Sequence, residues 1–281
     1  MENIVLIGDS ITDGGTFPAL VESFARINGR TEFEYINLGV SSENTTALTE
    51  EGHPFPRPCV FNRLDRILQQ VEGTWATVMY GENDAIYQPF DAERFERYQQ
   101  GITRLVDRLK DAGFRVALMT PTPFDPISFG GKLTEESPCP FGTVYAGYND
   151  IMKAYAGWIR ESAIADKVID VYTPISDYLA ARRRENPKFK TGDGIHQGAE
   201  GNFLIARELL RALFDIQLGE FNQTPIPSIY PLVRKKSAYI HRYYKELIGH
   251  DNPYKEKPIT RAAMRRKVDR CNRKIQKKLG L

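Results

Sequence analysis

Three short stretches of the sequence carry side chains that together could perform acyl transfer. Ser10 follows four apolar residues and a glycine, a pattern typical of a buried parallel strand that ends in a tight turn. Asp193 stands three residues before His196, and Asn83 follows another apolar run. A serine hydroxyl becomes a strong nucleophile when an imidazole accepts its proton, and a carboxylate orients that imidazole. We therefore expect Ser10 to be the nucleophile, His196 its base and Asp193 the partner of that base.

The same chemistry needs hydrogen-bond donors for the negative oxygen that forms on the attacked carbonyl. The sequence offers the backbone N–H of Ser10, the backbone N–H of Gly39 and the side-chain amide of Asn83. Gly39 is attractive because a substrate can approach a residue that lacks a side chain. We expect these three groups to form an oxyanion hole. The simpler alternative for Ser10 is a helix N-cap without a chemical role.

The elements that must position these residues alternate along the chain. Strand-like apolar runs occur at 4–7, 33–38, 75–80, 114–119 and 167–171, with helical spacing between them. This alternation predicts an α/β fold with a five-stranded parallel sheet, helices on both faces and the strand order 2-1-3-4-5. The candidate residues all follow strands or lie in loops. They should therefore meet at the carboxyl edge of the sheet, where such folds bind ligands.

Four motifs occur in order: Gly8-Asp9-Ser10-Ile11-Thr12, Asn37-Leu38-Gly39, Gly81-Glu82-Asn83-Asp84 and Asp193-Gly194-Ile195-His196. Together they resemble the blocks of the SGNH, or GDSL-type, esterase and acylhydrolase family over about residues 3–215. The resemblance implies a three-layer α/β/α flavodoxin-like fold, a Ser-His-Asp mechanism and no metal or other cofactor. Ile11 stands where the family commonly has leucine, and in some members the aspartate is dispensable.

Two connections are too long to be simple turns. Residues 49–59 contain three prolines and residues 121–143 contain five. Long loops that follow strands usually form binding sites, so we expect both to wall the substrate pocket, with plain surface loops as the alternative. His53 in the first loop and Glu82 in the third motif are candidate substrate contacts. For each of these two side chains, a solvent-facing position is the simpler expectation.

The resemblance favours a serine esterase that acts on small acyl esters through an acyl-serine, in particular a carbohydrate O-deacetylase. A lysophospholipase- or thioesterase-like acylhydrolase is the alternative among enzymes. A phosphate- or nucleotide-binding module is the alternative of another class, because the start of a helix after a strand also binds anions. The sequence has neither a G-x-G-x-x-G fingerprint nor a P-loop lysine, which argues against that module.

Charge divides the chain near residue 216. Residues 217–281 hold 16 Lys and Arg against 5 Asp and Glu, a net charge of +11, so residues 1–216 carry −9. We predict a hydrolase domain over 1–216 and a basic helical extension over 217–281. The extension should pack on the body or on a partner subunit, which would make it a route to a homo-oligomer. Because tyrosines are interleaved with its basic residues, binding to nucleic acid is the less favoured alternative.

Composition excludes several other classes. No apolar run approaches the ~20 residues that a membrane span needs, and we expect no membrane partner. The first residues form a strand pattern and no signal peptide, so a cytoplasmic location is expected, with a secreted mature form as the alternative. Three cysteines without a C-x-x-C pair predict neither a disulfide framework nor a metal site.

Overall fold

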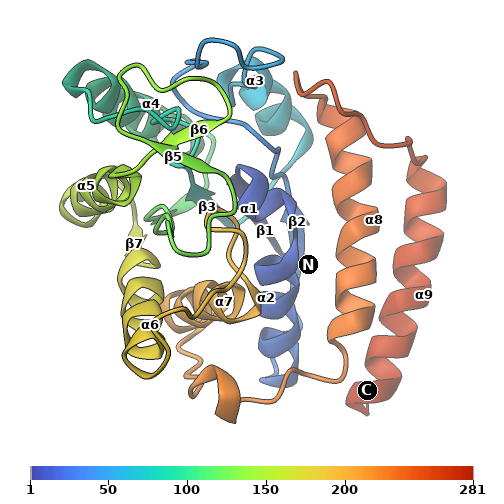
Figure 1. Ribbon diagram of the computed structural model, residues 1–281. Coiled ribbons are helices and arrows are strands. Elements are labelled where there is room, and N and C mark those ends of the chain that lie inside the picture. Colours follow the sequence, from blue (N-terminus) through green and yellow to red (C-terminus); the bar gives the residue numbers. More distant parts are fainter. Residues whose placement is uncertain (1, 281) are drawn as a thin grey trace.

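A five-stranded parallel sheet lies between two layers of helices in the computed structural model, which describes residues 2–280 (Figure 1). Its strands, in spatial order, are β2 (Phe33–Asn37), β1 (Glu2–Gly8), β3 (Trp75–Met79), β4 (Arg115–Met119) and β7 (Lys167–Ile169). Strand β1 pairs with both β2 and β3, with Ile4 opposite Tyr35 on one side and Trp75 on the other. The predicted fold class and strand order are confirmed, with β7 as the fifth strand.

The side chains of β1 alternate between two apolar cores, one on each face of the sheet. Val5 and Ile7 belong to the core under α3 (Phe61–Gln70), α4 (Ala92–Asp111) and α5 (Tyr148–Glu161). Ile4 and Leu6 belong to the opposite core, under α2 (Thr16–Ile27), α6 (Tyr172–Glu185) and α7 (Ala199–Phe214). A strand buried on both faces is continuously apolar, which explains the run that precedes Ser10.

Three features of the fold lie outside the sequence-based expectations. Helix α6 was not predicted, because only a narrow stripe of its residues is apolar and no side chain caps its first turn. A four-residue helix, α1 (Ser10–Asp13), begins at the predicted nucleophile itself. Within the second long loop, β5 (Lys132–Thr134) and β6 (Thr143–Tyr145) form a small parallel pair.

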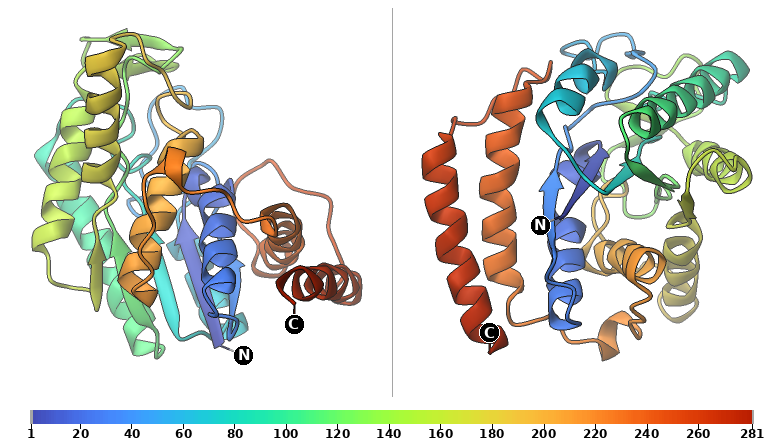
Figure 2. Two further views of the ribbon diagram at one scale, coloured as in Figure 1. Left: turned by 90° about the horizontal axis from the view of Figure 1, so that it is seen from below. Right: turned by 180° about the vertical axis from the view of Figure 1, so that it is seen from behind.

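The basic extension forms two antiparallel helices beside the β2 edge of the sheet (Figures 1 and 2). After the short 3₁₀ turn η1 (Phe221–Gln223), α8 (Tyr230–Ile248) packs against α2, β2 and α3, and α9 (Arg261–Leu279) packs against α8. The Thr260 hydroxyl caps α9 by accepting the Ala263 N–H, whereas α8 begins after Ile229 without a side-chain cap. Within residues 2–280, no helix has the length and apolar character of a membrane span.

One buried ion-pair cluster joins α8 to the body. The Lys236 side chain is fully buried, and its ammonium binds the carboxylates of Glu22 in α2 and Glu34 in β2. A charge removed from water must be paired, so this lysine specifies where α8 docks. The extension therefore packs on its own chain, which was one of the two expected arrangements.

Candidate active site

Ser10 occupies the first position of α1, directly after the turn that ends β1. The Asp9 carboxylate caps this helix by accepting a hydrogen bond from the Ile11 N–H at 3.0 Å. Burial raises the pKa of Asp9 to about 7, although the Ile11 N–H opposes the shift. A Cβ on Gly8 would lie 2.3 Å from the Thr12 hydroxyl, so only glycine fits the turn. The sequence therefore places the Ser10 hydroxyl at the carboxyl edge of the sheet.

The structure brings Ser10, His196 and Asp193 together. Nε2 of His196 lies 2.8 Å from the Ser10 hydroxyl, and Nδ1 lies 2.8 Å from the Asp193 carboxylate. The other Asp193 oxygen accepts the backbone N–H groups of Ile195 and His196. Partial burial acts to raise the pKa of Asp193, but these hydrogen bonds outweigh it and lower the pKa below its usual value. The carboxylate is therefore ionised at neutral pH and holds the ring with Nε2 facing the serine.

The second long loop supports the turn that carries His196. Gly194 has φ +92°, and a Cβ there would lie 2.7 Å from the backbone oxygen of Asp125. The Asp125 N–H donates to the Gly194 carbonyl at 2.8 Å, and its carboxylate pairs with Arg183 of α6 at 2.5 Å. The glycine in the Asp-Gly-Ile-His motif is thus required by a close approach of two loops.

Asn83 is held by a buried ion pair from the first long loop. Nη1 of Arg57 donates to Oδ1 of Asn83 at 2.7 Å, and Arg57 also forms a two-pronged pair with Glu50. Because a guanidinium has only donors, the amide nitrogen of Asn83 must face away from it. That nitrogen donates one hydrogen to the Glu43 carbonyl at 3.3 Å, and within residues 2–280 its second hydrogen has no acceptor. Asn83 therefore keeps a hydrogen-bond donor that an oxyanion could accept.

Gly39 does not serve as the predicted oxyanion donor. Its N–H donates to the Asn37 side chain at 2.8 Å, so the group is already engaged. A Cβ at this position would lie 2.2 Å from the Asp13 nitrogen, which explains why the residue is glycine. The prediction of Gly39 is corrected here: close packing against α1, and not an approaching substrate, requires the absence of a side chain.

The next turn offers a different donor, the N–H of Ser42. Ser42 has φ +63° in a turn closed by a hydrogen bond from the Glu43 N–H to the Val40 carbonyl. Among the described residues, every backbone N–H from 38 to 45 has an acceptor except that of Ser42. A non-glycine residue in the left-handed region is uncommon and often marks a functional site. Nothing in the local sequence announces this conformation, so the sequence could not identify Ser42.

Buried polar side chains hold the Ser42 turn from inside the protein. The Glu43 carboxylate forms a two-pronged pair with Arg63, with both contacts at 2.6 Å, and accepts the Tyr80 hydroxyl. Asp84 accepts the N–H and hydroxyl of Thr45, each at 2.7 Å. Burial raises the pKa of Asp84 to about 6, although both Thr45 donors lower it. Asp84 thus supports the loop.

The two candidate substrate contacts have different environments. The Glu82 residue is 1% exposed, so the solvent-facing alternative is wrong, and neither of its carboxyl oxygens has a partner among the described residues. Burial and the nearby Asp9 raise the pKa of Glu82 well above its usual value. His53 is half-buried and lies edge-on to Phe55 and Phe141.

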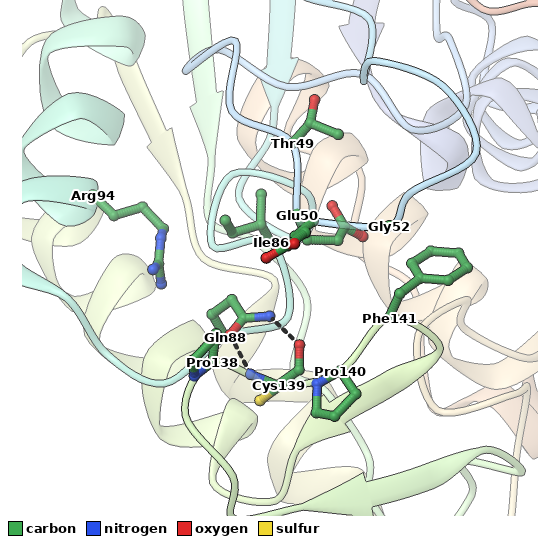
Figure 3. Close-up of a pocket in the computed structure, with 11 residues that line it drawn as sticks. Thr49, Glu50, Gly52, Ile86, Gln88, Arg94, Pro138, Cys139, Pro140 and Phe141 are labelled. Atoms are coloured by element: carbon green, nitrogen blue, oxygen red, sulfur yellow. Dashed lines mark hydrogen bonds between the residues drawn. The ribbon is translucent and has the colours of Figure 1, made fainter.

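A cavity of about 400 Å³ lies between the two long loops (Figure 3). Glu50 and Gly52 contribute from the first loop, and Cys139 and Phe141 from the second. Gln88 joins the walls, because its side chain exchanges hydrogen bonds with the Cys139 backbone at 3.0 and 2.6 Å. The two loops therefore face one cavity, which Ser10 and His196 do not line, and Glu50 links it to Asn83 through Arg57. That this cavity receives the substrate stays a prediction.

Within residues 2–280, no group of three His, Cys, Asp or Glu side chains is arranged to hold a metal ion. The three cysteines, Cys59, Cys139 and Cys271, are separate, buried thiols.

Comparison with known proteins places the chain among ester hydrolases. No curated protein matches the sequence. The model of the GDSL-like Lipase/Acylhydrolase family matches residues 6–203, which include Ser10, Asn83 and His196. The chain belongs to this family. It is a GDSL-type carboxylic ester hydrolase, and the matched region ends before α8.

Solved structures share the fold of this GDSL hydrolase at low identity. Axe2, an acetylxylan esterase from Geobacillus stearothermophilus, is 19% identical, with a TM-score of 0.54 over 75% of this chain and 93% of its own. The acetyl xylan esterase AlAXEase is 18% identical, with a TM-score of 0.54 over 75% of this chain and all of its own. BT4096, a gut microbial diltiazem-metabolizing enzyme, is 18% identical with a TM-score of 0.57, but the match spans 75% of this chain and only 46% of BT4096.

Proposed function

We propose that this GDSL hydrolase removes short acyl groups, chiefly acetyl, from hydroxyls of a carbohydrate. The observation that carries the esterase mechanism is the pair of hydrogen bonds that His196 makes with Ser10 and Asp193. The carbohydrate preference is supported by the cavity between the long loops. Its lining mixes charged and amide side chains, such as Glu50 and Gln88, with the ring of Phe141. Two proteins of the same fold bear acetylxylan esterase names.

In the proposed reaction, the Ser10 oxygen attacks the ester carbonyl while Nε2 of His196 takes the hydroxyl proton. Asp193 stabilises the resulting imidazolium. The oxyanion receives hydrogen bonds from the N–H groups of Ser10 and Ser42 and from the Asn83 amide. His196 then protonates the departing alcohol. Water, activated by the same imidazole, hydrolyses the acyl-serine and restores the free hydroxyl.

The surroundings of Asn83 favour a short acyl chain. The buried Arg57 side chain holds the amide, and Tyr87 lies over the guanidinium, with its ring centre 5.3 Å away. The cavity between the two long loops, with its mixed polar and apolar lining, would receive the alcohol part of the ester. Its size is in the range that binds small ligands.

A substrate panel tests this proposal. Acetylated sugars and p-nitrophenyl esters of increasing acyl length are compared, with Ser10→Ala as the blank. We expect kcat/KM to be highest for acetyl esters and to fall as the chain lengthens, and acetylated sugars to be cleaved. A rise with chain length would instead identify a lysophospholipase- or thioesterase-like enzyme. Unchanged hydrolysis by the Ser10→Ala protein would refute the mechanism.

A further inference from the structure

The C-terminal extension reaches the catalytic loops through Asp13, the last residue of α1. One Asp13 carboxylate oxygen accepts the N–H and the hydroxyl of Ser41, at 3.0 and 2.5 Å. The other accepts Nε2 of His241 at 2.7 Å and Nζ of Lys245 at 2.6 Å, both from α8. Burial acts to raise the pKa of Asp13, but His241 and Lys245 outweigh it and lower the pKa far below its usual value. The carboxylate thus ties α8 to both α1 and the residue before Ser42.

His241 makes a second contact that fixes the same loop. Its Nδ1 lies 2.8 Å from the backbone oxygen of Asn37, so both ring nitrogens face acceptors and the ring bridges β2 and α1. The Asn37 side chain in turn binds the Thr12 carbonyl at 2.6 Å and the Gly39 N–H at 2.8 Å. The loop that leads to Ser42 is therefore braced by α8 at its beginning.

The most direct contact comes from Asn252, just after α8. Its amide nitrogen donates to the Ser41 carbonyl at 2.8 Å, and its amide oxygen accepts the Tyr254 N–H at 2.9 Å. The contact with Tyr254 fixes the orientation of the Asn252 amide, so that its nitrogen faces Ser41. Asn252 is only 4% exposed, so water does not readily replace it. The side chain is thus a fixed donor aimed at one peptide group.

That peptide group is the one whose N–H belongs to Ser42. A trans peptide is planar, and its C=O and N–H point in opposite directions. A donor on the Ser41 oxygen therefore sets the direction of the Ser42 N–H, and it also polarises that N–H toward a negative acceptor. The orientation of the Ser41–Ser42 peptide thus depends on Asn252, which lies 211 residues after Ser41 in the chain.

We propose that the C-terminal extension completes the active site, with Asn252 as a positioning residue that aims the Ser42 N–H at the oxyanion. His241 and Lys245 assist by holding Asp13 and Ser41. The inference rests on the proposed function, because it gives the Ser42 N–H a role in acyl transfer. The family match ends at residue 203, so the motif-bearing region does not contain this support.

The test compares two neighbouring residues of the full-length protein. Asn252→Ala removes the contact with Ser41, whereas Asp251→Ala removes a contact between the same segment and Asn62 of α3, at 2.6 Å, that does not touch Ser41. Hydrolysis of p-nitrophenyl acetate gives kcat and KM. The rate at which a fluorophosphonate labels Ser10 gives a readout that needs no natural substrate. Melting temperature and circular dichroism report the fold.

We expect Asn252→Ala to lower kcat and the labelling rate about 3- to 10-fold with KM within about twofold, because one hydrogen bond is lost. Asn252→Asp should lower kcat further, since a carboxylate oxygen would face the Ser41 carbonyl. Asp251→Ala should leave kcat unchanged. If Asn252→Asp does not fold, the comparison of the two alanine variants still decides the matter.

Two results would overturn this inference and leave the proposed function intact. The first is an unchanged kcat in Asn252→Ala. The second is an equal loss of kcat in Asp251→Ala, which would mean that the packing of the whole segment matters and not the Asn252 amide. A wild-type protein that neither cleaves esters nor reacts at Ser10 would overturn the proposed function, and this inference with it. The behaviour of the wild type therefore separates the two failures.

Discussion

The side chains of His196 and Asp193 remain 48% and 60% exposed, so solvent reaches the pair that activates Ser10. Water can therefore replace part of what Asp193 supplies. We expect Asp193→Asn to lower kcat about 10- to 100-fold, less than the ~10⁴-fold loss seen where such an aspartate is buried. The asparagine oxygen can still accept the N–H groups of the turn. Its amide N–H can also face Nδ1 of His196, which favours the tautomer with the proton on Nε2, and that nitrogen then cannot accept the Ser10 proton. Steady-state kinetics with a p-nitrophenyl ester measure the loss, and a 10⁴-fold loss would contradict this view of an open pair.

Ser42 permits a sharper test, because its backbone and not its side chain is the proposed donor. Its φ of +63° is strained for serine and relaxed for glycine. We expect Ser42→Gly to keep kcat within about twofold and to raise stability by up to about 1 kcal/mol. Kinetics and thermal unfolding check both statements. A large loss of turnover in a folded Ser42→Gly protein would show that the hydroxyl is needed.

At the scale of elements, the loop of residues 49–59 holds Asn83 through a buried ion pair. Arg57→Met leaves Glu50 unpaired and should destabilise the protein by about 3–5 kcal/mol. The double variant Arg57→Met/Glu50→Met should regain most of that stability, because no uncompensated charge stays buried. It should not regain kcat, since nothing then fixes the Asn83 amide. Urea unfolding and kinetics on the same samples check this, and recovery of kcat along with stability would show that Arg57 only stabilises the loop.

The cap of α1 makes stability depend on pH. The pKa of Asp9 is raised by burial to about 7, whereas the unfolded carboxyl ionises near pH 4. The unfolded state therefore loses its proton first, and this residue's contribution to stability falls as pH rises from about 4 to 7. Asp9→Asn should be more stable than the wild type at pH 8, by about 2–4 kcal/mol, and equal to it near pH 4. A difference independent of pH in urea unfolding would contradict the shift.

Elements differed in how well the sequence predicted them. The strands were identified because a sheet buried on both faces demands continuous apolar runs, such as Ile4 to Ile7. Helix α6 was missed because its buried residues form a sparse stripe without a capping side chain. Gly39 was assigned the wrong task because a glycine required by packing and one required by a substrate look the same in sequence. The structure distinguishes them through the acceptor already bound to the Gly39 N–H.

At the scale of the whole molecule, the two C-terminal helices have different tasks. Helix α8 contacts the body and the catalytic loops, whereas α9 rests on α8 and buries Cys271 and Ile275. We expect Ile275→Ala to destabilise the protein by about 2–4 kcal/mol through the cavity it leaves, with kcat unchanged. Thermal unfolding and kinetics check this. A loss of kcat comparable to that of Asn252→Ala would show that α9 also acts on the site.

The contact of the extension with α1 could not be predicted from sequence. The opposite charges of residues 1–216 and 217–281 suggested that the two parts pack together, but they did not identify Asp13, His241 or Asn252. Hydrogen bonds between segments more than 200 residues apart leave no local pattern in the sequence. Association of copies through these helices stays a prediction that light scattering can test. The cytoplasmic location also stays a prediction.

The central claim is that the Ser10 oxygen, activated by His196, forms an acyl-enzyme. Mass spectrometry of protein quenched during turnover of p-nitrophenyl acetate tests it most directly. We predict one added acetyl group on the peptide that contains Ser10 in the wild type, and none in Ser10→Ala or His196→Ala. Turnover with no acetyl group on Ser10, or acetylation of the wild type only at another residue, would contradict the account.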